Sequence, residues 1–135
     1  YVAVDGARVV GYATVTPGHI EIEDVPSALR KRLPRYPLPV LRLARLAVDE
    51  SFRGRGLGRQ LLRFVLDLAV RMAGDFGCAG VVVDAKPGAV SYYQQFGFAP
   101  LEVVEGLSQA KPSPTPMFLS LKEIEAACKP GPALQ

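Results

Sequence analysis

The segment 56–74 has the strongest hydrophobic periodicity in the chain. Apolar residues recur there at steps of three and four, which is the spacing of one face of an α-helix. These residues are Leu57, Leu61, Val65, Leu68 and Met72. Charged residues line the opposite side at steps of four, which makes the pattern amphipathic. We therefore predict a surface helix over 56–74, with Gly74 and Gly77 bracketing its end.

Runs rich in β-branched residues predict a sheet around this helix. Asp5-Gly6 lies between two such runs, and this dipeptide is typical of a hairpin turn. The predicted strands lie at 1–4, 8–15, 40–48, 79–83, from 98 onward, and at 117–121. A second helix is predicted over 89–95, opened by Pro87 and stopped by Gly97, and one or two helical turns over 122–128.

The segment 24–39 carries four prolines, which exclude a long regular element. One or two helical turns fit between Pro26 and Leu33. The predicted order is β-β-loop-β-α-β-α-β-β, an α/β (α+β) arrangement in which helices cover a mixed sheet.

Arg42 and Arg45 interrupt the apolar run 40–48. They have opposite parity, so they cannot both face solvent from a regular strand with one buried face. Either a bulge intervenes or one arginine pairs inside a site. For Arg45, a buried structural salt bridge and an active-site role both remain open, and so does the role of Lys86.

Composition is that of an ordinary globular domain. The 135 residues are 49% hydrophobic and 21% charged, which excludes a disordered chain, and the apolar runs are too short to span a membrane. With no CxxC pair and a single histidine, His19, we expect no metal site and reduced thiols in the cytoplasm. The chain does not begin with Met, so we expect an N-terminally incomplete domain over 1–128 and a tail over 129–135.

Basic residues concentrate between Arg30 and Arg45, where six occur without an acidic residue, although the net charge is only +3. Such a cluster suits a partner that carries phosphates. For any single residue of the cluster, an ordinary solvated loop is the alternative.

The segment Arg53-Gly54-Arg55-Gly56-Leu57-Gly58 joins a predicted buried strand to the predicted helix. The start of a helix presents unpaired N–H groups and a partial positive charge. Glycines let an anion approach that backbone, and arginines add charge and forked donors. The sequence therefore predicts a phosphate cradle, although a tight strand-to-helix turn would have a similar sequence. The Gly-Lys-Ser/Thr ending of a Walker loop and the last glycine of the dinucleotide motif are missing.

Two motifs resemble those of the GNAT acetyltransferase superfamily. Arg53, Gly56 and Gly58 match its R/Q-x-x-G-x-G/A motif, and the segment 89–98 looks like its A-x-x-F/Y-Y-x-x-x-G-F segment. The resemblance covers essentially the whole chain and implies the GNAT fold, a mixed, mostly antiparallel sheet with flanking helices whose N-terminal strand and helices are absent here. It also implies acetyl-CoA as cofactor. The implied cofactor-binding residues are Leu46, Ala47, Val48, Arg53, Gly54, Arg55, Gly56, Leu57, Gly58 and Arg59.

The resemblance implies that Tyr93 is the general acid that protonates the leaving thiolate, whereas we expect Tyr92 to be core packing. No carboxylate lies within 40–48, and Glu21 and Glu23 are the nearest candidates for a base. An α-amine has a pKa of about 8, so much of it is neutral near pH 7 and needs no strong base. This favours an α-amine over lysine as the acceptor.

A narrower resemblance, through 43–49, Gly11-Tyr12 and 116–119, is to the GNAT toxins of bacterial toxin–antitoxin pairs. It implies acetylation of aminoacyl-tRNA, a ribbon-helix-helix antitoxin as partner and a possible homodimer. The expected tRNA contacts are Arg30, Lys31, Arg32 and Arg35. The alternatives are a GNAT enzyme for a protein N-terminus or a small amine, and a CoA- or nucleotide-binding module without catalysis.

Overall fold

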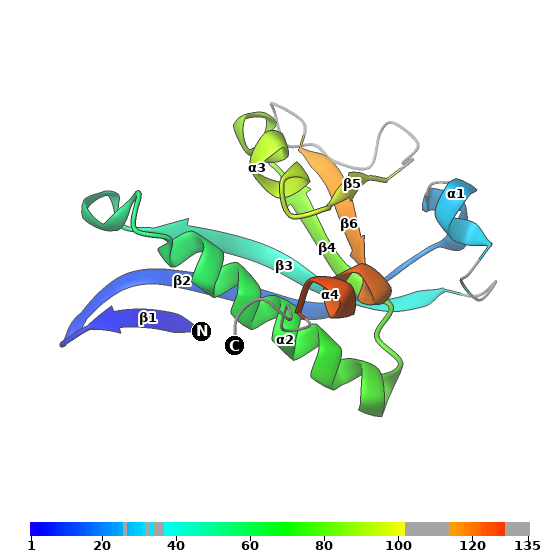
Figure 1. The fold of residues 1–135 in the computed structure, drawn as a ribbon, viewed down its shortest axis with the longest axis horizontal. Coiled ribbons are helices and arrows are strands. Elements are labelled where there is room, and N and C mark those ends of the chain that lie inside the picture. Colours follow the sequence, from blue (N-terminus) through cyan, green and yellow to red (C-terminus); the bar gives the residue numbers. More distant parts are fainter. Residues whose placement is uncertain (26, 32, 34–36, 102–113, 129–135) are drawn as a thin grey trace, which may run out of the picture.

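The computed structural model of the chain describes residues 1–25, 27–31, 33, 37–101 and 114–128. Its centre is a six-stranded sheet in the order β1-β2-β3-β4-β6-β5 (Figure 1). The strands are β1 (Val2–Asp5), β2 (Arg8–Ile20), β3 (Leu38–Val48), β4 (Gly80–Ala85), β5 (Ala99–Pro100) and β6 (Thr115–Ser120). Neighbouring strands are antiparallel except β3 and β4, which run parallel. This confirms the predicted mixed, mostly antiparallel sheet.

Four helices accompany the sheet, in the order expected from the sequence. They are α1 (Ser27–Arg30), α2 (Leu57–Phe76), α3 (Val90–Gln94) and α4 (Leu121–Cys128), with short 3₁₀ turns η1 (Ile22–Asp24), η2 (Glu50–Phe52) and η3 (Pro87–Ala89). The predicted hairpin at Asp5-Gly6 is present, and Gly6 supplies the positive φ, 61°, that its turn requires.

The two faces of the sheet carry separate hydrophobic cores. The larger core joins α2, α3 and α4 to alternate residues of β3, β4 and β6, including Leu43, Val83 and Tyr93. The smaller core, with Val40, Val82 and Phe118, lies on the opposite face beneath the η1 segment. Period-two alternation along each strand sends neighbouring residues to opposite cores. No described helix combines the length and hydrophobicity needed to cross a membrane.

Several predicted boundaries move by a few residues. The second strand continues through Pro17 to Ile20, because β1 pairs with β2 only as far as Tyr12 and Pro17 needs no donor on that side. Beyond this strand, Ile22 begins the 3₁₀ turn η1. The long helix runs through Gly74 and ends where Gly77 adopts φ 67° and donates its N–H to the Ala73 carbonyl.

A β-bulge resolves the conflict between the two strand arginines. Arg45 pairs with Thr14 and Leu43 with Val15, so Ala44 is an extra residue in β3. The bulge brings Arg42 and Arg45 to the same face of the sheet. Arg45 is exposed, so the interpretation of this residue as a buried salt bridge is wrong.

Candidate active site

The parallel strands β3 and β4 pair over a short stretch and then separate. Their register runs from Leu41 opposite Val81 to Leu43 opposite Val83. Beyond Leu43, β3 continues beside β2 while β4 turns away toward α3 (Figure 1). Within the described chain, the last residues of β3 therefore have a partner strand on one side only.

Two residues at the end of β3 direct their backbone groups to the unpaired side. The Asp49 N–H donates to the Val10 carbonyl at 2.8 Å. Because bonded pairs alternate along an antiparallel ladder, Ala47 bonds to Tyr12 of β2, whereas Leu46 and Val48 point their N–H and C=O groups away from it. Of the three strand residues predicted to bind the cofactor, Leu46 and Val48 thus offer free backbone donors and acceptors.

The predicted phosphate cradle lies between η2 and α2. Gly54 and Gly56 adopt φ values of 79° and 77°, which side-chain-bearing residues rarely adopt. A Cβ on either glycine would meet nothing within 4 Å, so backbone conformation alone explains these glycines. No side chain caps the start of α2, and its first turn carries no acidic residue. The first N–H groups of a 20-residue helix therefore remain available to an anion.

Aromatic rings hold two of the cradle's arginines. The Arg55 guanidinium lies over the Phe52 ring, 4.7 Å from its centroid, and that of Arg59 lies 5.5 Å from the centroid of Phe96. Cation–π contacts of this kind restrict the side chain while leaving its N–H donors free. Arg53, Arg55 and Arg59 are all exposed, so the positive charge of the cradle faces solvent.

Gly58 marks the point where the cradle, the end of β3 and α3 meet. A Cβ atom on Gly58 would lie 3.0 Å from the Tyr92 hydroxyl oxygen and 3.7 Å from a Val48 methyl carbon. The end of β3 and the sequence-distant helix α3 thus both meet the first turn of α2. Sequence reasoning assigned Tyr92 to core packing alone and missed that its hydroxyl touches the cradle.

Tyr93 lies in α3 with its ring in the larger core and only 7% of its surface exposed. It makes edge contacts with Tyr92 and Phe98, with ring centroids 5.3 and 5.6 Å apart. Burial, followed by the neighbouring Tyr92, raises the pKa of the Tyr93 phenol above its ordinary value of 10. Within the described chain, the Tyr93 hydroxyl forms no hydrogen bond. Every fully buried polar side-chain atom there has a hydrogen-bond partner, so the Tyr93 hydroxyl oxygen is not fully buried. The hydroxyl therefore keeps contact with solvent.

Asp49 ties the end of β3 to the cradle. Its carboxylate accepts hydrogen bonds from the Ser51 N–H at 2.9 Å and the Ser51 hydroxyl at 2.6 Å, and pairs with Arg8 at 3.0 Å. The Ser51 bonds, more than the Arg8 charge, lower the pKa of Asp49 from 3.8 to about 2.

We expect Asp49→Asn to lose stability in a pH-dependent way. A lowered folded-state pKa means that the ionised Asp49 stabilises the fold above about pH 4 and that this contribution is lost as the pH falls toward 2. The difference in melting temperature between the parent protein and the variant should therefore shrink between pH 4 and pH 2. Asp75→Asn, on the last turn of α2, is the control, and a difference that stays constant over this range would contradict the assignment.

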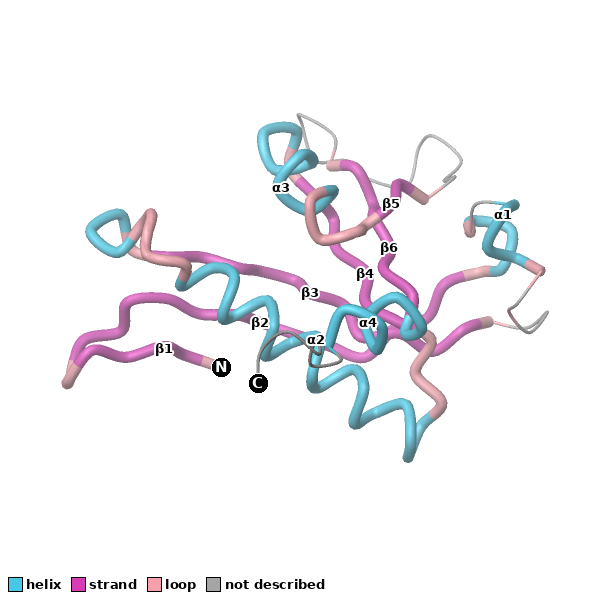
Figure 2. Tube along the Cα trace, in the orientation of Figure 1, coloured by secondary structure: helices cyan, strands magenta, loops and turns pink. Residues whose placement is uncertain are grey.

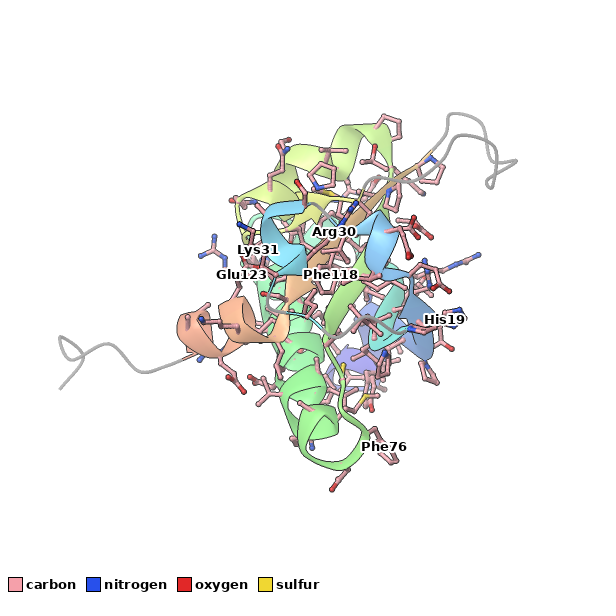
Figure 3. All side chains as sticks on the ribbon, turned by 90° about the vertical axis from the view of Figure 1, so that its right-hand side faces the viewer. His19, Arg30, Lys31, Phe76, Phe118 and Glu123 are labelled. Carbon is pink, nitrogen blue, oxygen red and sulfur yellow. The ribbon has the colours of Figure 1, made fainter. Side chains whose placement is uncertain are left out.

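The predicted tRNA-binding residues lie at the other end of β3. Arg30 and Lys31 lie at the end of the molecule shown in Figure 3, and Arg32 and Arg35 fall outside the described residues. The Arg30 guanidinium donates to the backbone carbonyls of Val25 at 2.7 Å and Glu23 at 2.6 Å, so it stabilises the turn before α1. The 11-residue strand between this end and the cradle is roughly 33 Å long.

Among the candidate carboxylates, Glu21 precedes η1 and Glu23 lies within it, on the segment that leads to α1, whereas Tyr93 lies in α3 (Figure 2). Sequence reasoning missed Asp84 of β4, which forms an ion pair with Arg42 at 2.8 Å just beyond the last β3–β4 pair. Its position directly after a buried strand was the available signal. Across the described ranges, no group of three or more histidines, cysteines or carboxylates could hold a metal.

Comparison with known proteins assigns this chain to a family. Residues 1–100 match the profile of the acetyltransferase (GNAT) domain. A tRNA-acetylating toxin of Mycobacterium tuberculosis is 36% identical over 99 residues, which are 73% of this chain and 59% of that protein. The chain thus spans about three fifths of the length of this relative.

Two solved structures share the fold. AtaT complexed with acetyl-methionyl-tRNAfMet superposes with a TM-score of 0.76 at 28% identity, covering 90% of this chain and 68% of that one. A tyrosine-to-phenylalanine mutant of AtaT, bound to the C-terminus of the antitoxin AtaR and acetyl-CoA, has a TM-score of 0.69 at 26% identity. The superposition covers 90% of this chain and 65% of the AtaT chain.

Proposed function

Because this chain belongs to the GNAT acetyltransferase family, we propose that it is an acetyl-CoA-dependent N-acetyltransferase. We propose further that it is a toxin, which acetylates the α-amine of aminoacyl-tRNA and so blocks translation. The observation that carries the enzymatic part is the junction at Gly58, where the cradle meets the open end of β3 and the helix of Tyr93. The aminoacyl-tRNA part draws on the relatives, a tRNA-acetylating toxin and AtaT with its acetylated tRNA.

The cradle suits the diphosphate of coenzyme A. The uncapped N–H groups at the start of α2 and the exposed Arg53, Arg55 and Arg59 offer donors and positive charge. The free backbone groups of Leu46 and Val48 suit the amide-bearing arm of the cofactor, as in the addition of a strand to a sheet edge. Acetyl-CoA supplies the thioester from which an amine takes the acetyl group.

Tyr93 is the proposed general acid. When the acceptor amine forms its bond to the acetyl carbon and the bond from carbon to sulfur breaks, the Tyr93 phenol donates its proton to the leaving sulfur. The raised pKa of Tyr93 keeps the phenol protonated at neutral pH, as this role requires. The backbone N–H of Leu46 or Val48 stabilises the negative charge that develops on the carbonyl oxygen.

The acceptor is proposed to be an α-amine because residues 40–48 contain no carboxylate that could act as a base. An α-amine with a pKa of about 8 is substantially neutral near pH 7, and water accepts its second proton after attack. A lysine amine, with a pKa of about 10.4, would need a base to compete.

The proposed partners follow the same relatives. AtaT was solved with its antitoxin AtaR, so we propose that a protein antitoxin, of the ribbon-helix-helix type, neutralises this chain. We also propose a cytoplasmic location, where charged tRNA is found, and a homodimer as the assembled form.

The direct test supplies labelled acetyl-CoA with charged tRNA, N-terminal peptides and small amines in parallel. Transfer to charged tRNA together with arrest of translation in an extract would support the proposal. Transfer to peptides or small amines alone would instead favour a GNAT enzyme of another substrate class. Calorimetric binding of acetyl-CoA without any transfer would favour a binding module that does not catalyse.

We expect neutralisation of the four basic residues of the α1 segment to weaken tRNA binding. In the variant Arg30→Gln, Lys31→Gln, Arg32→Gln and Arg35→Gln, each lost phosphate contact should lower the slope of log K against log salt by about one. Because Arg30 also holds backbone carbonyls, the triple variant that retains it separates electrostatics from folding. Undiminished binding and transfer by both variants would remove this segment from the tRNA interface.

A further inference from the structure

Two aromatic rings of the α3 segment pack against the first turn of α2. Tyr92 brings its hydroxyl against Gly58, where an added Cβ would lie 3.0 Å from the oxygen. Phe96, which follows α3, has the Arg59 guanidinium over its ring, 5.5 Å from the centroid. The two rings also touch each other edge to face, with centroids 5.1 Å apart. Both rings and the first turn of α2 therefore form one packed unit.

Phe96 is held in place from two sides. Its side chain is half-buried and packs against the larger core. Its backbone N–H donates to the Tyr93 carbonyl at 3.1 Å, which ties Phe96 to the end of α3. A helix of five residues is too short to be stable alone, so the placement of α3 depends on such tertiary contacts. The ring is thus a fixed support for whatever lies on it.

Arg59 depends on this ring for its orientation. Its side chain is exposed and, among the residues that the structure describes, forms no ion pair or hydrogen bond. Burial raises the pKa of the Tyr92 phenol, and the charge of Arg59 opposes that rise, which agrees with a guanidinium held beside the two rings. A guanidinium that lies over a ring keeps its N–H donors available to an anion.

The other arginine–ring contact of the cradle is of a different kind. Arg55 lies over Phe52, which precedes it closely in the same segment, so this pair forms within η2 and the turn that follows it. Arg59 belongs to α2, before β4, whereas Phe96 comes after α3. The contact between Arg59 and Phe96 therefore forms only when α3 has packed against α2.

We propose that Phe96 is a positioning residue for the cofactor, which holds the Arg59 guanidinium ready for a phosphate of acetyl-CoA. The inference rests on the proposed function and deepens it, because it joins the cradle to the segment that carries the proposed general acid. Phe96 itself binds no phosphate. It orders Arg59 before the cofactor arrives, so that binding costs less side-chain entropy.

A double-mutant cycle tests the proposal, with the Kd for acetyl-CoA measured by calorimetry. Phe96→Leu keeps an apolar side chain but removes the ring face, and it should raise the Kd about two- to tenfold. Arg59→Gln should raise the Kd about 10- to 100-fold. The double variant should match Arg59→Gln, because Phe96 acts only through that guanidinium. Phe96→Tyr, which keeps the ring face, should have the parent Kd.

Phe64→Leu is the matched control, because it makes the same exchange on α2 at a ring that contacts Tyr1 instead. Its Kd for acetyl-CoA should equal that of the parent protein. If Phe96→Leu melts below the temperature of the measurement, Phe96→Met replaces it in the cycle, since methionine fills irregular space in a core.

The outcomes separate this inference from the proposed function. If the parent protein binds acetyl-CoA but the two losses add in the double variant, Phe96 supports the fold alone and the inference is overturned while the proposed function stands. The same holds if Phe96→Tyr binds as weakly as Phe96→Leu. If the parent protein binds no acetyl-CoA, the proposed function fails and the inference fails with it.

Discussion

Replacing Tyr93 with phenylalanine is expected to lower kcat about 10²- to 10⁴-fold, the usual contribution of a general acid. The exchange removes one hydroxyl and keeps the ring, which is 7% exposed and packed against Tyr92 and Phe98. Folding and acetyl-CoA binding should therefore be preserved. Single-turnover transfer from labelled acetyl-CoA measures the chemical step, and calorimetry measures cofactor binding.

Tyr92→Phe is the matched control, because it makes the same change one residue earlier in the same helix. The Tyr92 hydroxyl lies against Gly58 of the cradle, so its loss should affect the Kd for acetyl-CoA more than kcat. Equal losses of kcat in the two variants would show that Tyr93 has no special part in proton transfer.

The pH profile supplies an independent check on Tyr93. Activity should rise through about pH 8 as the α-amine loses its proton. It should fall again only above pH 10, because the raised pKa of Tyr93 keeps the acid protonated up to that point. The Tyr93→Phe profile should lack the alkaline fall. An alkaline fall that persists in this variant would assign it to another group.

Replacing Gly58 with valine is expected to weaken acetyl-CoA binding about 10- to 100-fold, the equivalent of the 1–3 kcal/mol that overpacking costs. The first added carbon would lie 3.0 Å from the Tyr92 hydroxyl and 3.7 Å from a Val48 methyl. The further methyl groups would force α3 or the end of β3 away from α2. Because the proposed site depends on this convergence, kcat should fall as well.

Gly74→Val is the control for Gly58→Val, since it places the same residue on the same helix where a Cβ would meet nothing within 4 Å. Both variants make the same change in intrinsic helix propensity, so a larger fall in melting temperature for Gly58→Val than for Gly74→Val measures the overpacking at the junction. The loss of cofactor affinity should belong to Gly58→Val alone. Parent-like affinity in Gly58→Val would mean that the junction is not part of the cofactor site.

The β3–β4 pair organises the whole proposed site. Three paired residues hold the two strands together, and beyond Leu43 and Val83 they separate. The separation frees the backbone of Leu46 and Val48 on one strand and places α3 beyond the end of the other. One face of the sheet then carries the cradle and Tyr93, and the opposite face carries Arg42, Arg45 and Asp84.

Local signals predicted most of the fold. The periodic apolar stripe identified α2, and the Asp5-Gly6 dipeptide identified the first hairpin. Both depend on interactions between residues that are close in the sequence. The boundaries at Pro17 and Gly74 were missed because each depends on the neighbouring elements, which decide whether a proline or a glycine is tolerated.

Short segments of the chain were enough to predict the order of the elements, the glycine- and arginine-rich start of α2 and the tyrosine pair in α3, because each is a local property. Packing between distant segments sets which face of the sheet receives Arg45, pairs Arg42 with Asp84, and brings the Tyr92 hydroxyl to Gly58. A single bulge at Ala44 inverts the parity of every later residue in β3. Strand register and long-range contacts of this kind depend on how distant segments pack, which no local pattern records.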